Sequence, residues 1–206
     1  MASEIWFENP HAGQRSRIVT LPGETGGRRF VLDYVNQPFA GEHAVPAHLH
    51  TAYTESFEIL SGRARYRLGG ETKTAVAGDR VVMPPMVPHV HPWSDSAEEL
   101  HVRQVADASP ADLRGLNASL QAAITIQALA KAGRVNDKGL PNLLQLGVLI
   151  ATTMPATYLA GPPILLQRVL FAALGTIGRA AGYKTSYPQY GVITAGGLQM
   201  PASAPM

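Results

Sequence analysis

The stretch that decides the fold is His48–Gly62, HLHTAYTESFEILSG, in which two histidines and a glutamate stand among β-type residues. Successive side chains of a strand point to opposite faces, so His48 and His50 share one face. We expect Glu55 to return on the adjacent strand after the turn-like segment TAYT. Three metal-capable side chains would then converge from one hairpin, on a face where hydrophobic residues ordinarily sit.

A fourth candidate ligand lies in the later stretch 77–93, AGDRVVMPPMVPHVHPW, where His89 follows a proline-rich corner between two expected strands. Three imidazoles and one carboxylate suit a first-row divalent metal and leave positions open for water or substrate. A single histidine in a strand is more often exposed or hydrogen-bonded than a ligand. We interpret His11, His43 and His101 in that way.

Residues 1–108 consist of short β-type runs separated by glycine-rich turns such as LPGETGG, LGGE and AGD. Many short strands with such turns favour a β-sandwich or barrel. Within one run, Arg63, Arg65 and Arg67 alternate with apolar side chains, which indicates a solvated face opposite a buried one.

Beyond Ser109 the hydrophobic period changes from two residues to about 3.6, and three helices are predicted. The first should run from Asn117 to Gly133, the second should lie between Pro141 and Met154, and the third should follow Pro163. The expected domains are therefore a barrel over 1–108, a helical extension over 109–190 and a flexible tail over 191–206.

The predicted helices are unusually apolar, so they must be buried against something. Prolines break the uncharged stretch 139–167 into pieces too short to span a bilayer, and Arg168 lies inside the third helix. We therefore expect packing on the barrel or on a second copy of the chain, as a homodimer or larger assembly. Contact with a membrane surface is the minor alternative.

The composition excludes several classes of function. The chain has no cysteine, so any metal must be held by His, Asp or Glu. A net charge of +2 over 206 residues, without a basic run, makes nucleic acid a poor candidate partner. The N-terminus has no apolar segment typical of a signal peptide, and we expect a cytoplasmic protein.

The two motifs together resemble the cupin family. Its first motif, a glycine, five residues, H-x-H, three or four residues, a glutamate, six residues and a glycine, is matched by Gly41, His48, His50, Glu55 and Gly62. Its second motif, a glycine, five residues, P-x-G, two residues, a histidine, three residues and an asparagine, is matched by Gly78, Pro84 and His89. The match covers about residues 28–105.

Three positions depart from the cupin pattern. Six residues instead of five follow Gly41, Met86 replaces a glycine, and Trp93 replaces the asparagine. A residue with a Cβ resists the positive φ that glycine adopts freely, so Met86 puts the turn before His89 in doubt. A shifted corner would present His91, which lies on the same face of the strand.

The resemblance implies a mainly β fold, a jelly-roll barrel with one divalent transition metal held by His48, His50, Glu55 and His89. The metal could be Fe, Mn, Ni, Cu or Zn. Strand parity directs a set of mostly apolar side chains to the same interior, where they are candidates for a substrate pocket: Phe57, Ile59, Ala64, Tyr66 and Trp93. Tyr53 and His91 are the candidates for proton transfer.

Three functions fit this site. The first is an Fe(II) or Mn(II) oxygenase acting on a small, largely apolar or aromatic substrate, since cupins with this ligand set are often oxygenases. The second is a non-redox lyase, isomerase or cyclase in which the metal acts as a Lewis acid. The third is a module that binds or senses a small molecule without catalysis. The fold resemblance does not decide among them.

Overall fold

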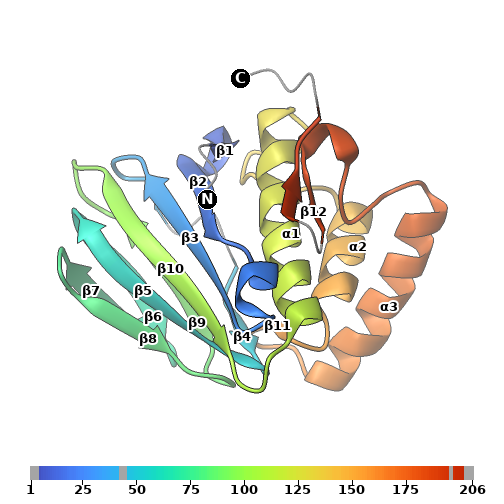
Figure 1. The fold of residues 1–206 in the computed structure, drawn as a ribbon, viewed down its shortest axis with the longest axis horizontal. Helices are drawn as coiled ribbons and strands as arrows, with labels where there is room; N and C mark the ends of the chain where they lie inside the picture. Colours follow the sequence, from blue (N-terminus) through green and yellow to red (C-terminus); the bar gives the residue numbers. More distant parts are fainter. Residues whose placement is uncertain (1–4, 42–45, 195–196, 202–206) are drawn as a thin grey trace.

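The computed structural model describes residues 5–41, 46–194 and 197–201. Two antiparallel sheets face each other as a jelly-roll sandwich, and three helices gather at one end of it (Figure 1). The mainly β fold with three C-terminal helices that the sequence predicts is therefore confirmed.

The larger sheet has six strands, and its central strands form the floor of the barrel. In their order across the sheet they are β1 (Phe7–Asn9), β2 (Gln14–Thr20), β3 (Arg29–Asn36), β10 (Leu100–Ala108), β5 (Tyr53–Ser61) and β8 (Arg80–Met83). Two short 3-10 turns, Pro10–Ala12 and Pro22–Thr25, join the first three strands.

The smaller sheet has five strands and carries the histidine motifs. In order across the sheet they are β11 (Thr157–Leu159), β4 (His48–His50), β9 (His89–Ser94), β6 (Arg63–Leu68) and β7 (Glu71–Val76). The arginine row of β6 faces outward, where Arg63 and Arg65 both approach Asp95, as the alternation predicts.

The interior between the sheets is layered along the strands. The inward residues of β5 are Tyr53, Glu55, Phe57 and Ile59, so an apolar layer, a polar layer and a second apolar layer follow one another. The inward residues of β10 repeat this order, with Gln104 in the polar layer. The polar side chains are therefore enclosed between two hydrophobic clusters.

Helix α1 (Leu113–Lys131) covers one of these clusters. Its buried stripe of Leu116, Leu120 and Ile124 packs on the inner face of the six-stranded sheet, as the 3.6-residue period predicts. The helix begins four residues before the predicted start, because the Asp112 carboxylate accepts a hydrogen bond from Gly115 N at 2.8 Å and caps the helix. Asn117 lies inside it.

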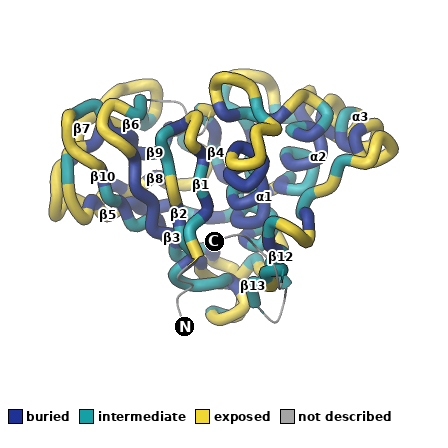
Figure 2. Tube along the Cα trace, turned by 90° about the horizontal axis from the view of Figure 1, so that it is seen from above, coloured by how far each residue is buried: buried dark blue, intermediate teal, exposed yellow. Residues whose placement is uncertain are grey.

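Helices α2 (Leu143–Thr153) and α3 (Ile164–Ala180) form the outer layers, and they lie close to the predicted bounds. Figure 2 shows α1 buried between the strands and these helices, while α3 is the most exposed of the three. Within the described ranges, no helix combines the length and the apolar character that crossing a membrane would require.

The segment between α2 and α3 was not expected to be a strand. Residues 157–159 form β11, which pairs antiparallel with β4 and closes the edge of the five-stranded sheet. The predicted boundary near residue 108 therefore does not separate the barrel from the helices, because the extension supplies one strand of the barrel.

The last described residues differ from the expected flexible tail. A 3-10 turn, Pro188–Tyr190, leads into β12 (Val192–Thr194) and β13 (Gly197–Gln199), which pair with each other. Ile193 and Leu198 pack against the hydrophobic cluster under α1, and this packing stabilises the two strands. Residues 195–196 and 202–206 of the expected tail lie outside the described residues.

Candidate metal centre

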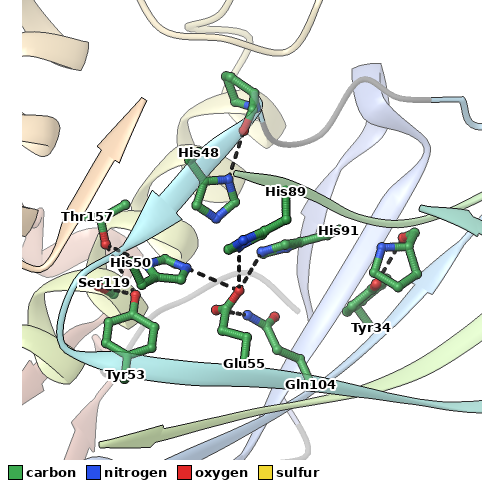
Figure 3. A network of polar contacts seen from close by, with 12 residues as sticks. Tyr34, His48, His50, Tyr53, Glu55, His89, His91, Gln104, Ser119 and Thr157 are labelled. Carbon is green, nitrogen blue, oxygen red and sulfur yellow. Dashed lines mark hydrogen bonds and ion pairs between the residues drawn. The ribbon is translucent and has the colours of Figure 1, made fainter. Parts of the chain in front are cut away.

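Five side chains in the polar layer bring their donor atoms together. One ligand atom from each of them lies within 4.8 Å of all the others: His48, His50, Glu55, His89 and His91. Four of the residues are buried, and the side chain of His91 is 16% exposed, which makes it the one reached from outside. Figure 3 shows the imidazoles of His50, His89 and His91 directed toward the Glu55 carboxylate.

The donors come from opposite sheets. His48 and His50 lie on β4, and His89 and His91 lie on its neighbour β9, with His48 paired opposite His89 in the ladder. Glu55 lies on β5 in the other sheet. The expectation that His48, His50 and Glu55 share a hairpin is therefore wrong. Only Thr51 and Ala52 of the predicted turn TAYT connect the two strands, and they carry the chain from one sheet to the other, so the histidines and the glutamate face each other.

The corner before β9 keeps the conformation that the resemblance requires, although its glycine is replaced. Met86 adopts φ 65° and donates its backbone N–H to His50 O at 2.7 Å. Met86 is 56% exposed. A methionine in place of the motif's glycine therefore costs backbone strain but causes no clash in the interior. His89 thus points into the cluster, and His91, two residues later, also reaches it.

Two of the histidines are held in the tautomer that a metal needs. His48 Nδ1 lies 2.8 Å from Pro46 O, and His89 Nδ1 lies 2.9 Å from Val87 O. A carbonyl oxygen only accepts hydrogen bonds, so each Nδ1 must carry a proton. In the neutral ring the Nε2 atom then presents its lone pair to the cluster, as a metal-ligating histidine does.

The donor atoms that face the centre lack hydrogen bonds. The Nε2 atoms of His50 and His89 are buried without a hydrogen-bond partner, although Glu55 Oε2 lies 3.1 Å and 3.4 Å away. Buried polar atoms are ordinarily paired, so these two require an explanation. A cation at the point where the lone pairs converge would satisfy them, and the residues present fit a divalent metal.

Glu55 supplies the single negative charge of the cluster. Gln104 donates to its Oε1 at 2.7 Å, which leaves Oε2 facing the histidines. Burial by itself would raise the pKa of Glu55, but His50 and His91 hold the pKa well below its usual range. The carboxylate is therefore ionised. The sequence motif did not identify Gln104, although a glutamine among the apolar inward positions of LHVRQVADA is a readable signal.

The imidazoles of β4 remain neutral. Burial lowers the pKa of His48 well below 6.5, and the neighbouring histidines act in the same direction. Burial also lowers the pKa of His50, against the opposing effect of Glu55. The two imidazoles of β4 thus leave the negative charge of Glu55 uncompensated by their own, and a buried carboxylate favours a cation over an anion.

The two candidates for proton transfer differ in position. His91 Nε2 lies 2.9 Å from Glu55 Oε2, beside the centre and next to the ring of Phe57 at 4.8 Å between centroids. Tyr53 is 2% exposed, its ring stacks on His50 at 4.1 Å, and its hydroxyl contacts Ser119 and Thr157. Burial raises the pKa of Tyr53, so its hydroxyl keeps its proton.

Four of the five expected pocket residues lie in the barrel interior, as the period of two predicts. Phe57, Ile59 and Ala64 are fully buried in one hydrophobic cluster, with Tyr66 packed at its edge. The inward position predicted for Trp93 is wrong, because a register shift in the β6–β9 pairing sets it opposite Arg65 of the outward-facing arginine row. Packing alone accounts for the apolar character of these residues, and contact with a substrate stays a prediction.

The remaining histidines have no part in the described cluster. His101 is a partly exposed residue beside Glu99, and His11 is exposed, as expected for ordinary surface histidines. His43 lies outside the described residues.

Residues 39–104 match the family model of the cupin domain. No curated protein matches the chain. Solved structures that resemble it include a candidate sugar phosphate isomerase from Acidithiobacillus ferrooxidans, with 21% identity over 48% of this chain and 61% of that one and a TM-score of 0.39. This chain thus covers less than two thirds of that protein.

Two further solved structures are each similar over about half of the chain. KdgF from Halomonas sp. is 16% identical, with 50% of this chain and 86% of that one covered and a TM-score of 0.39. The cupin domain of an XRE family transcriptional regulator from Enterobacter cloacae is 15% identical, with 46% and 96% covered and a TM-score of 0.38.

Proposed function

Because the chain belongs to the cupin superfamily through residues 39–104, we propose that it is a metal-dependent enzyme acting on a small organic substrate. His48, His50, Glu55 and His89 would hold one divalent transition metal, among Fe, Mn, Ni, Cu and Zn. The observation that supports this most directly is the pair of buried Nε2 atoms, on His50 and His89, that face the centre without a hydrogen bond.

The reaction we favour is an oxygenase-type oxidation of a largely apolar or aromatic substrate. When bound, iron or manganese supplies a redox centre with coordination positions open to dioxygen and substrate. The hydrophobic clusters on both sides of the polar layer exclude water from it. The carboxylate of Glu55, oriented by Gln104, would contribute one negative charge, which compensates half the charge of a divalent ion.

His91 favours a second candidate, a non-redox lyase, isomerase or cyclase. Its Nε2 lies 2.9 Å from Glu55 Oε2 and its side chain is partly exposed, so it can hold or transfer a proton where a substrate enters. In that reaction the metal would serve as a Lewis acid. A binding module without catalysis would use the same centre but would not require His91.

Elemental analysis of protein purified without chelators or a metal-binding tag tests the proposal. We expect about one equivalent of a transition metal in the wild type, a loss in His50→Ala, and no loss in the surface control His101→Ala. Iron, manganese, copper or nickel would direct the work to oxygen-uptake screens with aromatic substrates. Zinc would favour the Lewis-acid reaction, and wild-type protein that neither contains nor takes up metal would refute the metal centre.

A further inference from the structure

The helical extension reaches the metal centre through a single residue of β11. Thr157 lies opposite His50 in the β4–β11 ladder, and its Oγ1 lies 2.9 Å from His50 Nδ1. This is the nitrogen of His50 that faces away from the cluster. Figure 3 shows Thr157, Ser119 and Tyr53 grouped behind the His50 ring, on the side opposite Glu55.

The hydroxyl of Thr157 continues into a chain of hydrogen bonds. Its Oγ1 lies 3.2 Å from the hydroxyl of Tyr53, which donates to Ser119 Oγ on α1 at 3.0 Å. Each hydroxyl has one proton to donate. With Tyr53 donating to Ser119, Thr157 must be the donor to Tyr53, and Thr157 Oγ1 then accepts a hydrogen bond from His50 Nδ1–H.

We propose that Thr157 is a positioning residue, through which the C-terminal extension fixes His50 in the Nδ1–H tautomer that directs the Nε2 lone pair to the metal. The inference rests on the proposed metal centre. His48 and His89 obtain the same tautomer from backbone carbonyls near them in sequence. His50 obtains it from a side chain 107 residues away.

The geometry on the other side of the ring agrees with this direction. If these hydrogen bonds ran in the opposite direction, His50 Nε2 would carry the proton and donate it in a hydrogen bond to Glu55 Oε2. These two atoms are 3.1 Å apart, yet His50 Nε2 is buried without a hydrogen bond, because the N–H direction does not meet the oxygen. An Nε2 lone pair at this position remains available to a metal.

The test compares the affinity for Zn²⁺, measured by competition with a chromophoric chelator, in metal-free wild type and three variants. Thr157→Val keeps the shape of the side chain and removes the hydroxyl, and we expect binding to weaken by about 10- to 100-fold. Thr157→Ser keeps the hydroxyl and should restore most of the affinity. Thr51→Val is the matched control, because Thr51 Oγ1 also joins the barrel to the extension, but it does so by donating to Pro155 O and not through the His50 ring.

A second measurement separates positioning from a general loss of structure. In protein labelled with ¹⁵N at histidine, the ring nitrogen shifts of metal-free wild type should report Nδ1–H for His50, and Thr157→Val should mix the two tautomers. Equal Zn²⁺ affinity in wild type and Thr157→Val would overturn the inference and leave the metal centre standing. An equal loss in Thr51→Val would also overturn it, whereas a wild type that binds no Zn²⁺ would refute the proposed function itself.

Discussion

His89 and His91 stand two residues apart on β9 and share one face, yet their surroundings differ. His89 is buried, and its Nδ1 is fixed by Val87 O. The side chain of His91 is partly exposed, and its Nε2 pairs with Glu55. The sequence predicted the shared face from the period of two, but it could not separate a ligand from a proton carrier, because that depends on the anchor of the second nitrogen.

From this difference we expect separate outcomes for two matched substitutions. His89→Gln should lose bound metal to the same degree as His50→Ala, because it removes a converging lone pair. His91→Gln should keep about one equivalent and lose turnover, since it removes a proton donor beside the centre. Metal content by elemental analysis and turnover on an identified substrate measure the two effects. Metal loss in His91→Gln would instead make His91 a ligand.

Among the elements, α2 and α3 approach each other more closely than large side chains allow. A Cβ built on Gly178 would lie 2.7 Å from Leu144 O and 2.7 Å from Val148 Cγ2. Gly147 and Gly175 make similar approaches in the same interface. The position of α3 therefore depends on these glycines, because backbone atoms of α2 cannot move aside independently.

We expect Gly178→Leu to destabilise the protein by about 1–3 kcal/mol or more, through overpacking between the two helices. Arg168→Leu places a leucine at an exposed position of the same helix, away from the glycines, and should leave the stability nearly unchanged. Thermal unfolding of both variants measures the difference. A Gly178→Leu variant as stable as wild type would mean that α3 packs in another way.

The length of an element and the clarity of its hydrophobic period decide whether the sequence can predict it. The three helices each carry several turns of an apolar stripe, so their bounds were predicted to within a few residues, apart from the Asp112 cap. β11 has three residues between two helices, too few to show a period, and its strand conformation comes from its partner β4. For the same reason Thr157 and Ser119 could not be assigned to the site, because only the tertiary fold brings them to His50.

For the whole molecule, α3 presents an apolar surface that is exposed in the described part of the chain. Leu165, Leu166, Val169 and Ile177 are between 56% and 73% exposed. Monomeric proteins seldom leave such neighbouring side chains in water. We propose that this surface packs against a second copy of the chain, as the apolar helices led us to expect.

Light scattering at micromolar concentration tests this proposal. We expect the wild type to be a dimer and the double variant Leu166→Glu, Val169→Glu to be a monomer, because charges would be buried in the interface. Val82→Glu, which changes an exposed apolar residue on the barrel strand β8, should remain a dimer. A monomeric wild type would refute the dimer interface, and the apolar surface of α3 would then have to contact something else, such as a membrane.

The position of β11 at the rim of the five-stranded sheet has a consequence for any shortened form of the protein. A chain cut near residue 108 would leave β4 as a bare edge, with unpaired N–H and C=O groups beside two histidines of the candidate metal centre. Such an edge invites pairing with another chain. Expression of the barrel alone would therefore favour aggregation or strand exchange between molecules, although the cupin motifs themselves would be intact.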